Sequence, residues 1–293
     1  MHTKNVMDLI DPSEQKKLFA RRDAIRAGMY AGLAMGSLPM VLAAMAKTAG
    51  AQTTAPSVND VLNFALKLEY LESEFYNIAT GVTALPAQYA GSNQVFTAAG
   101  HPVKAVFDEI AKHETAHVAV LKGALGSAAV AKPNFDFTGG SGAMSGGKFS
   151  GPFADVFSNP ATFLALAQAF EDTGVRAYKG GAQYLISNVP VLETALQIHS
   201  IEARHASKVR RIRGEKGWIS GRANTLPAQA QAVYGPGNPA TTYPAEDNTT
   251  QAGVNVTTLA GVSGNVTAAA ASEAFDEPLD TGTVLAIAGL FIY

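Results

Sequence analysis

Two short motifs in this sequence pair a glutamate with a histidine three residues later, Glu114 with His117 and Glu202 with His205. In an α-helix this spacing places both side chains on one face. Carboxylate and imidazole groups are ligands for iron, manganese or zinc. The sequence has no cysteine, so disulfides, thiolate catalysis and Cys-ligated metal centres are excluded. Any metal must therefore be held by histidine and carboxylate.

Two further glutamates, Glu69 and Glu171, each precede a tyrosine by seven residues, Tyr76 and Tyr178. The chain order is thus Glu, Glu-x-x-His, Glu, Glu-x-x-His, which indicates an internal duplication of a helix pair. Burying these carboxylates costs several kcal/mol each unless they are paired or bind a cation. The pattern predicts a dinuclear metal site of the di-iron or di-manganese kind. Its predicted ligands are Glu69, Glu114, His117, Glu171, Glu202 and His205.

Apolar residues at helical spacing predict the elements that position these side chains. Four helices are expected, at about residues 57–80, 102–126, 159–186 and 190–213. Ser57 and Asp60 form a capping-box pattern, and Gly81 is a stop signal. Pro102 and Pro160 suit the first turn of the second and third helices. The third helix could run through the two glycines at 180–181.

The connections favour an all-α four-helix bundle over residues 52–216. Few residues join the last two helices, around 187–189, so these should be antiparallel neighbours. Residues 127–158 are rich in Gly, Ser and Phe, and so long a loop suits a crossover along the bundle. Residues 217–293 change character, with a β-like piece at 254–259 and a last apolar segment after Asp280. We expect them to form an irregular extension packed on the bundle.

Residues 1–51 are predicted to be a targeting signal and not part of the folded domain. They contain Arg21 and Arg22, an uncharged run over residues 27–46, and a small-residue cleavage pattern at 49–51. This resembles a twin-arginine export signal and predicts a periplasmic or otherwise exported protein, with a mature N-terminus near Gln52. The alternative is a retained membrane anchor, because the run is long enough to span a bilayer.

Composition gives little reason to expect a macromolecular partner. The net charge is −2 and the charged fraction 16%, so nucleic acid and acidic membranes are not expected partners. The exported chain is expected to bind no membrane unless the signal is retained as an anchor. Whether the chain forms a homo-oligomer is left open.

Four stretches resemble one family, the exported ferritin-like domain proteins, which are similar to plant desiccation-related proteins. The resemblance covers about residue 55 to the C-terminus and includes the closing Ala-Phe-Asp-Glu-Pro-Leu at 274–279. It implies a ferritin-like four-helix bundle, whereas the family's activity is poorly defined. The stretches are Leu68-Glu69-Tyr70-Leu71-Glu72, His113-Glu114-Thr115-Ala116-His117, residues 170–178 and Ile201-Glu202-Ala203-Arg204-His205.

The ligand set suits an oxidoreductase acting on O2, peroxide or Fe(II), with two iron or manganese ions; zinc is an alternative metal. A peroxidase needs an electron source, and this chain has no cysteine relay, whereas peroxide dismutation needs none. Cage-type iron storage fits less well, because the long loop and the extension would obstruct a shell. The other hypothesis is a metal-stabilised structural or stress-protection protein without turnover.

Several residues have alternative interpretations. His113, Glu114 and His117 also match the His-Glu-x-x-His motif of zinc proteases, but no third ligand follows at the expected spacing. Glu72 faces the predicted site and is a candidate extra ligand, proton relay or solvent-facing neighbour. Tyr76 and Tyr178 are candidate catalytic neighbours or core aromatics. His113 and His199 are expected to lie outside the ligand set, as supporting or otherwise satisfied residues. A basic face at the end of the fourth helix is expected from Lys208, Arg210, Arg211 and Arg213.

Overall fold

The computed structural model describes residues 55–89, 95–96, 101–222, 225–261 and 264–293. The expected export signal and its cleavage site fall outside these residues. Within the described part, no helix has both the length and the apolar character that a bilayer crossing requires.

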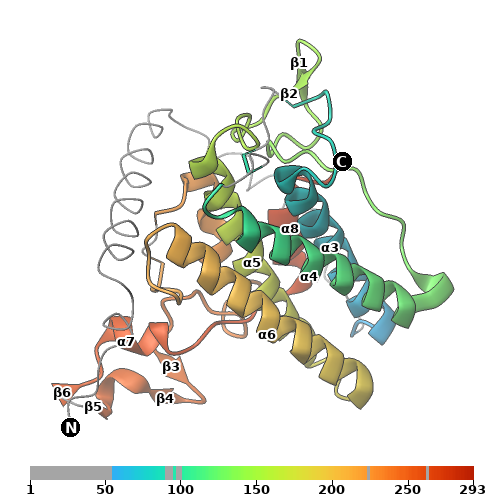
Figure 1. The fold of residues 1–293 in the computed structure, drawn as a ribbon. Helices are drawn as coiled ribbons and strands as arrows, with labels where there is room; N and C mark the ends of the chain where they lie inside the picture. Colours follow the sequence, from blue (N-terminus) through green and yellow to red (C-terminus); the bar gives the residue numbers. More distant parts are fainter. Residues whose placement is uncertain (1–54, 90–94, 97–100, 223–224, 262–263) are drawn as a thin grey trace, which may run out of the picture.

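Four long helices form the core of the molecule (Figure 1). They are α3 (Val58–Thr80), α4 (Lys104–Leu125), α5 (Pro160–Ala182) and α6 (Val189–Ile212). The closest packing is within two pairs, α3 with α4 and α5 with α6, and α3 also contacts α5. A short connection over 183–188 makes α5 and α6 antiparallel neighbours, as predicted. The all-α bundle expected from the periodicity is therefore confirmed.

The helix ends follow local capping chemistry. At α3 the amide of Asp60 donates to Ser57 Oγ (3.2 Å) while the Ser57 amide donates to Asp60 Oδ2 (2.9 Å), which completes the predicted capping box. The helix ends at Gly81, whose φ of 83° is left-handed. At α5, Asn159 caps the first turn by accepting from Ala161 N (3.0 Å), and Pro160 follows as expected.

Two predicted boundaries are wrong by two to four residues. The second helix starts at Lys104 instead of Pro102, because the Lys104 amide bonds back to His101 O (3.1 Å) in a preceding turn. The third helix ends at Ala182 instead of Ile186. There the Tyr184 amide reaches Gly181 O (3.0 Å), three residues back, so a tighter turn replaces the α-helical ladder.

Helix α5 is the most enclosed element of the bundle, with every residue from 163 to 178 buried. It packs on α6 and α3 on one side and on parts of the C-terminal extension, η3 (Ala228–Tyr234) and α8 (Thr281–Ala288), on the other. A helix surrounded in this way must satisfy its polar side chains internally. Glu171 and Asp172 are both buried. Glu171 faces His205 inside the bundle, whereas Asp172 pairs with Arg210.

The crossover covers one end of the bundle with aromatic side chains. It follows η2 (Gly126–Ala128) and contains a small hairpin of β1 (Met144–Ser145) and β2 (Lys148–Phe149). Phe137 and Phe157 pack on Phe75 of α3 with ring centroids 5.3 and 5.7 Å apart, and Phe163 of α5 stacks on the same ring at 4.5 Å. The phenylalanines of this loop thus form part of the core.

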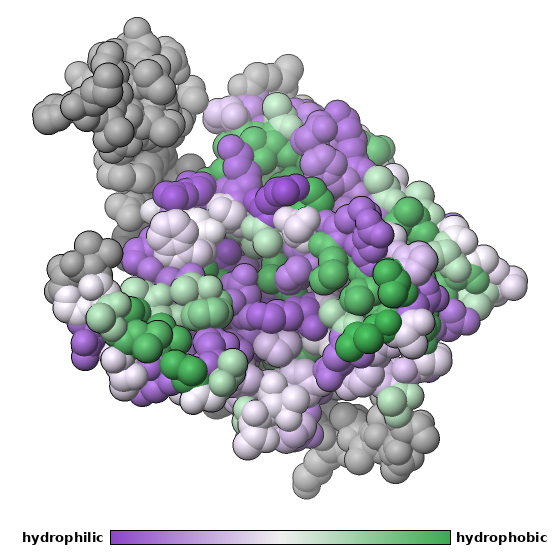
Figure 2. Space-filling model, turned by 90° about the horizontal axis from the view of Figure 1, so that it is seen from below, coloured by the Kyte–Doolittle hydropathy of each residue, from purple (hydrophilic) through white to green (hydrophobic). Residues whose placement is uncertain are grey.

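The C-terminal extension consists of short elements joined by turns. These are β3 (Thr250–Gln251) with β4 (Val254–Asn255), η4 (Val256–Thr258), β5 (Ala260–Gly261) with β6 (Gly264–Asn265), and α7 (Ala268–Glu273). Asp280 caps α8 by accepting from Thr283 N (2.9 Å). Seen from below, hydrophilic side chains run between separate hydrophobic clusters (Figure 2).

One buried arginine ties this extension to the bundle. Arg176 of α5 has no exposed surface, and its Nε pairs with Glu246 Oε1 at 2.8 Å. The guanidinium also donates to the carbonyls of Gly235 (2.9 Å) and Pro244 (2.9 Å). A single side chain therefore fixes several turns of the extension on the outer face of α5.

Candidate metal centre

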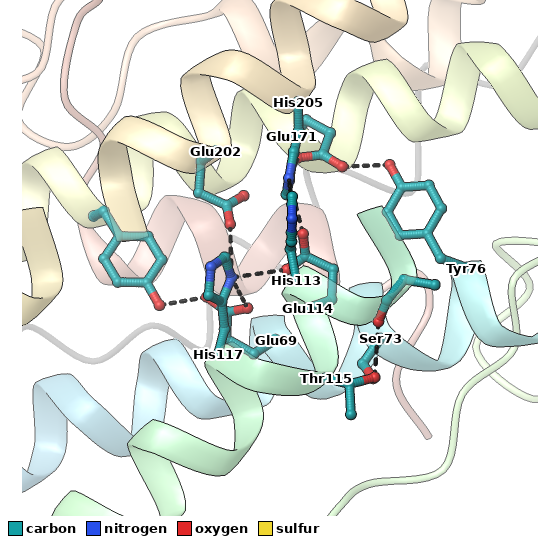
Figure 3. Close-up of polar contacts among 12 residues, drawn as sticks. Glu69, Ser73, Tyr76, His113, Glu114, Thr115, His117, Glu171, Glu202 and His205 are labelled. Atoms are coloured by element: carbon teal, nitrogen blue, oxygen red, sulfur yellow. Dashed lines mark hydrogen bonds and ion pairs between the residues drawn. The ribbon is translucent and has the colours of Figure 1, made fainter. Parts of the chain in front are cut away.

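The six predicted ligands converge in the middle of the bundle, with contributions from all four helices (Figure 3). The side chains of the four glutamates have no exposed surface, and those of His117 and His205 are 11% and 6% exposed. The helical spacing explains this, since each Glu-x-x-His pair turns both side chains inward from one helix.

One half of the cluster consists of Glu69, Glu114, His117 and Glu202. The Nδ1 atom of His117 lies 3.1 Å from Glu69 Oε2, 3.1 Å from Glu114 Oε2 and 3.4 Å from Glu202 Oε1. One ligand atom from each of the four residues falls within 4.8 Å of every other. Such a set can surround a single ion.

The other half consists of Glu114, Glu171, Glu202 and His205, also within 4.8 Å. His205 Nδ1 lies 2.8 Å from Glu114 Oε1 and 3.3 Å from Glu171 Oε2. Glu114 and Glu202 belong to both halves, whereas each half has its own histidine and one glutamate of its own. This buried cluster is compatible with a metal site.

The hydrogen bonding of the cluster is incomplete without a cation. Among the described residues, buried atoms that accept or donate no hydrogen bond include Glu114 Oε1, Glu171 Oε2, both carboxylate oxygens of Glu202, and His205 Nδ1. Although His205 Nδ1 is close to Glu114 Oε1, the two are not in hydrogen-bond geometry. Orphaned buried groups are costly, and atoms aimed at a common point instead of at each other suit metal ligation. The residues present therefore fit a metal.

The pKa values of the clustered glutamates also fit a site for cations. Burial raises the pKa of Glu69 to about 8, despite its contact with His117. Burial and repulsion from neighbouring glutamates raise the pKa of Glu202 well above its usual range. Burial opposes ionisation of Glu114 too, but its contacts with His117 and His205 outweigh it and hold that pKa at about 2. Two imidazoles do not balance this many carboxylates.

The pKa values of the two histidines are also raised, because their contacts with carboxylates outweigh the effect of burial. Burial disfavours protonation of His117, but its contacts with Glu114, Glu202 and Glu69 overcome that effect and raise its pKa to about 12. Burial likewise opposes protonation of His205, yet Glu171 and Glu114 raise its pKa to about 11. In the metal-free protein the imidazoles thus hold protons that a metal would displace.

The two tyrosines orient the outer glutamates across the bundle. Tyr76 of α3 donates its hydroxyl to Glu171 Oε1 on α5, and Tyr178 of α5 donates to Glu69 Oε1 on α3. In each case the other oxygen, Oε2, faces the histidine of its half. The tyrosines are core aromatics whose hydroxyls bond two of the predicted ligands.

Glu72 breaks the symmetry of the two repeats. It is 3% exposed, so the solvent-facing interpretation is wrong, and it belongs to neither ligand group. The corresponding residue on α5 is Gly174. A Cβ there would lie 2.5 Å from Glu202 Oε2 and 3.5 Å from Glu72 Oε1, so the glycine leaves room for both carboxylates.

His113 lies at the edge of the cluster and not inside it. Its Nδ1 is 2.9 Å from His205 Nε2, and its side chain is 42% exposed. It thus supports the ring of His205, as such partners of metal-binding histidines do. Neither His113 nor His199 belongs to a ligand group. This arrangement disfavours the zinc-protease interpretation, in which His113 and His117 would ligate together.

Sequence reasoning missed a second buried polar network on the outer face of α5. Asp172 pairs with Arg210 and accepts the hydroxyl of Tyr234, while Arg213 donates to Gln168. The expected basic surface at the end of α6 is therefore wrong for Arg210 and Arg213, which are 4% and 2% exposed. The signal available was the four-residue spacing of polar side chains in an otherwise apolar helix, Gln168, Asp172 and Arg176.

Comparison with known proteins agrees with this geometry. The family described as a ferritin-like domain matches residues 57–215, more than half of the chain. The match spans all four bundle helices and every predicted ligand. No curated protein matched the chain. The chain is a member of the ferritin-like domain family.

Proposed function

We propose that this chain binds two iron or manganese ions and is an oxidoreductase acting on a small oxygen species. The observation that carries the proposal is the sharing of Glu114 and Glu202 between two overlapping ligand groups. Shared carboxylates keep two ions close, and four ligand glutamates offset the charge of two divalent cations. Two redox metals held about 3.5–4 Å apart can exchange two electrons with bound O2 or peroxide.

The chain's own residues supply binding and orientation. Glu69 with His117, and Glu171 with His205, would each complete one ion's coordination, while Glu114 and Glu202 would bridge. Tyr178 and Tyr76 hold Oε1 of Glu69 and Glu171 and so present Oε2 to the ions. His113 fixes the ring of His205 through its Nε2.

Glu72 is the residue best placed to hold a proton beside the ions. Its burial, together with repulsion from Glu202, raises its pKa well above the usual value for a carboxyl. A carboxyl with a raised pKa can give a proton to an oxygen substrate and take it back. Hydrogen peroxide is the first candidate substrate, because its dismutation needs no external electron donor. O2 and Fe(II) are the others.

One observation favours a second function. The ligands are almost completely covered, with exposures of 11% or less, and an enclosed metal would serve a structural role equally well. In that case the chain is a metal-stabilised stress-protection protein without turnover, as the resemblance to desiccation-related proteins suggests.

A peroxide assay with a matched pair of variants separates the two functions. Wild-type protein loaded with Mn(II) or Fe(II) should release O2 from hydrogen peroxide. Glu202→Gln should lose this activity, while Glu193→Gln, a surface change on the same helix, should keep it. Wild-type protein that binds two ions and neither consumes peroxide nor reacts with O2 would support the structural function instead.

We also propose that the chain is exported through the twin-arginine route, on the pattern of residues 1–51. Replacing Arg21 and Arg22 together by lysine should leave the protein in the cytoplasm. Normal export of this double variant would contradict the twin-arginine route, and an intact N-terminus on the exported protein would contradict a cleaved signal.

A further inference from the structure

A small cavity lies in the bundle, toward the end at which α5 connects to α6. It is bounded by the first half of α3, the last turns of α5, and Leu185 and Ala195 beyond them. Its volume is about 20 Å3, whereas a single water needs about 10–15 Å3. Voids of this size are few in a packed core, and this one has room for a diatomic molecule.

The lining of the cavity is apolar. Among the described residues that line it, all have aliphatic, aromatic or no side chains, and Tyr178 contributes the one hydroxyl. That hydroxyl already donates to Glu69 Oε1. Water or hydrogen peroxide in this space would lose hydrogen bonds that the lining does not replace, whereas apolar cavities accept apolar guests. The cavity therefore suits a small molecule without hydrogen-bonding groups.

Small residues on three helices keep this space open. Ala65 of α3, Ala177 of α5 and Ala195 of α6 line it and are buried. Gly181 of α5 lines it as well, and a Cβ there would lie 3.2 Å from Val61 Cγ1. Larger apolar side chains at these positions would fill the cavity, so its presence depends on the choice of residue at each of them.

The cavity adjoins one half of the ligand cluster. Tyr178 lines the cavity and also bonds Glu69, and Leu68, which precedes Glu69, is a second lining residue. The other carboxylate oxygen of Glu69 lies 3.1 Å from His117 Nδ1. A single side chain, that of Tyr178, thus contacts both the cavity and a predicted metal ligand.

We propose that this cavity holds dioxygen on its way to or from the cluster. Dioxygen is diatomic, uncharged and apolar, as the size and lining of the cavity require. It is the substrate in one candidate reaction and a product in the other, because two molecules of hydrogen peroxide give two of water and one of O2. The role of the guest rests on the proposed function, whereas its binding can be measured without metal.

Nuclear magnetic resonance of the metal-free, full-length chain under O2 pressure tests the binding directly. Dissolved O2 is paramagnetic and speeds the relaxation of nearby methyl groups; nitrogen at the same pressure is the blank. We expect faster relaxation at the methyls of Ala65, Ala177 and Ala195 than at those of Ala79 and Ala167, which are fully buried elsewhere in the bundle. Equal effects at all five methyls would overturn the proposal.

A cavity-filling variant and its matched control locate the guest. In Ala195→Leu, the enhancement at Ala65 and Ala177 should fall to the value at Ala167. Ala119→Leu, at an exposed position of α4, should leave it unchanged. Thermal midpoints would show that both variants fold, and Ala65→Val, a smaller change in the same lining, replaces Ala195→Leu if that variant does not. An enhancement that survives filling would overturn the proposal.

Kinetics of the metal-loaded protein distinguish substrate from product. If O2 is the substrate, Ala195→Leu should slow O2 consumption by the Fe(II)-loaded chain. If O2 is the product, the same variant should slow its release from hydrogen peroxide. Unchanged rates of both reactions at unchanged metal content would overturn the role in transit. A wild type that binds no metal would contradict the proposed function, while the relaxation measurement would still decide whether the cavity holds dioxygen.

Discussion

Helix α5 carries two adjacent buried acids whose surroundings differ. Glu171 points into the bundle, where the four glutamates of the predicted ligand set and Glu72 meet only two imidazoles. Asp172 points to the outer face, where it pairs with Arg210. Close to it, Glu246 pairs with Arg176. The outer network supplies its own cations, whereas the inner cluster has more carboxylates than bases.

This difference in charge balance suggests a structural role for the outer network and a binding role for the inner cluster. In the outer network, arginines match the acids and hold the C-terminal extension on the bundle. Buried atoms without hydrogen-bond partners occur in both, but in the inner cluster the carboxylates outnumber the bases and raise one another's pKa values. Such a cluster without matching bases is compatible with cations bound from outside.

The largest expected effect comes from breaking the outer network. Arg176→Met would leave Glu246 unpaired and remove the hydrogen bonds to several carbonyls of the extension. We expect a loss of about 3–5 kcal/mol in the free energy of unfolding, as for other broken buried pairs. Chemical denaturation would measure it. Arg204→Met, at an exposed position of α6, is the control. An Arg176→Met variant as stable as the wild type would show that Arg176 does not hold the extension on the bundle.

The inner cluster should depend on metal in a way that the outer network does not. At a metal concentration a hundredfold above the dissociation constant, each independent site should add about 2.7 kcal/mol to stability. Thermal midpoints of metal-free and Mn(II)-loaded protein would show this as an upward shift. In Glu114→Gln the shift should disappear, because this residue belongs to both ligand groups. A full shift in that variant would argue against a shared ligand.

The pH dependence of metal-free protein follows from the raised pKa values. Glu69 keeps its proton up to pH about 8 in the folded state but only up to about 4.3 in an unfolded chain. The folded state therefore binds more protons between these values, and its stability should fall as pH rises from 5 to 8. The slope from one such group is at most about 1.4 kcal/mol per pH unit.

Metal should reverse that trend, because binding requires ionised glutamate and neutral imidazole. The stabilisation by metal should thus grow from pH 5 to pH 8. Glu69→Gln should flatten the metal-free slope, since the amide does not titrate. A metal-free protein whose midpoint rises over this range would show that the glutamates do not repel one another as described.

A smaller effect is expected from the tyrosines. Tyr76→Phe removes the hydroxyl that holds Glu171, and Tyr178→Phe does the same for Glu69. Loss of such a supporting hydrogen bond should weaken metal binding about tenfold. Each variant should affect one half of the cluster, which stepwise metal titration can resolve. Unchanged affinity in both variants would mean that the tyrosines serve only to fill the core.

The inner cluster could be predicted from sequence, whereas for the outer network the spacing of Gln168, Asp172 and Arg176 indicates a polar face of α5 but not its partners. Helical spacing alone places Glu114 beside His117 and Glu202 beside His205, and the repeat order adds Glu69 and Glu171. The partners of Arg176 are the carboxylate of Glu246 and turns of the extension up to 102 residues away, and no periodicity reports on such pairing. For the same reason Arg210 and Arg213 looked like surface residues.

Helix ends were predictable where a side chain caps them, as at Ser57 and Asn159, and less so elsewhere. The start of α4 lacks a side-chain cap, and the end of α5 is set by a tight turn over Gly181 and Ala182. The reason for a glycine at position 174 is visible only in the structure. The side chains of Glu202 and Glu72 occupy the space that a Cβ at this position would need.

The central claim is that two metal ions share Glu114 and Glu202. The most direct test is elemental analysis of the protein purified from its native host, with protein concentration determined independently. We expect two equivalents of iron or manganese per chain, falling to none in Glu114→Gln and unchanged in Glu193→Gln. A single equivalent of zinc, or no metal in protein that is otherwise folded, would contradict it.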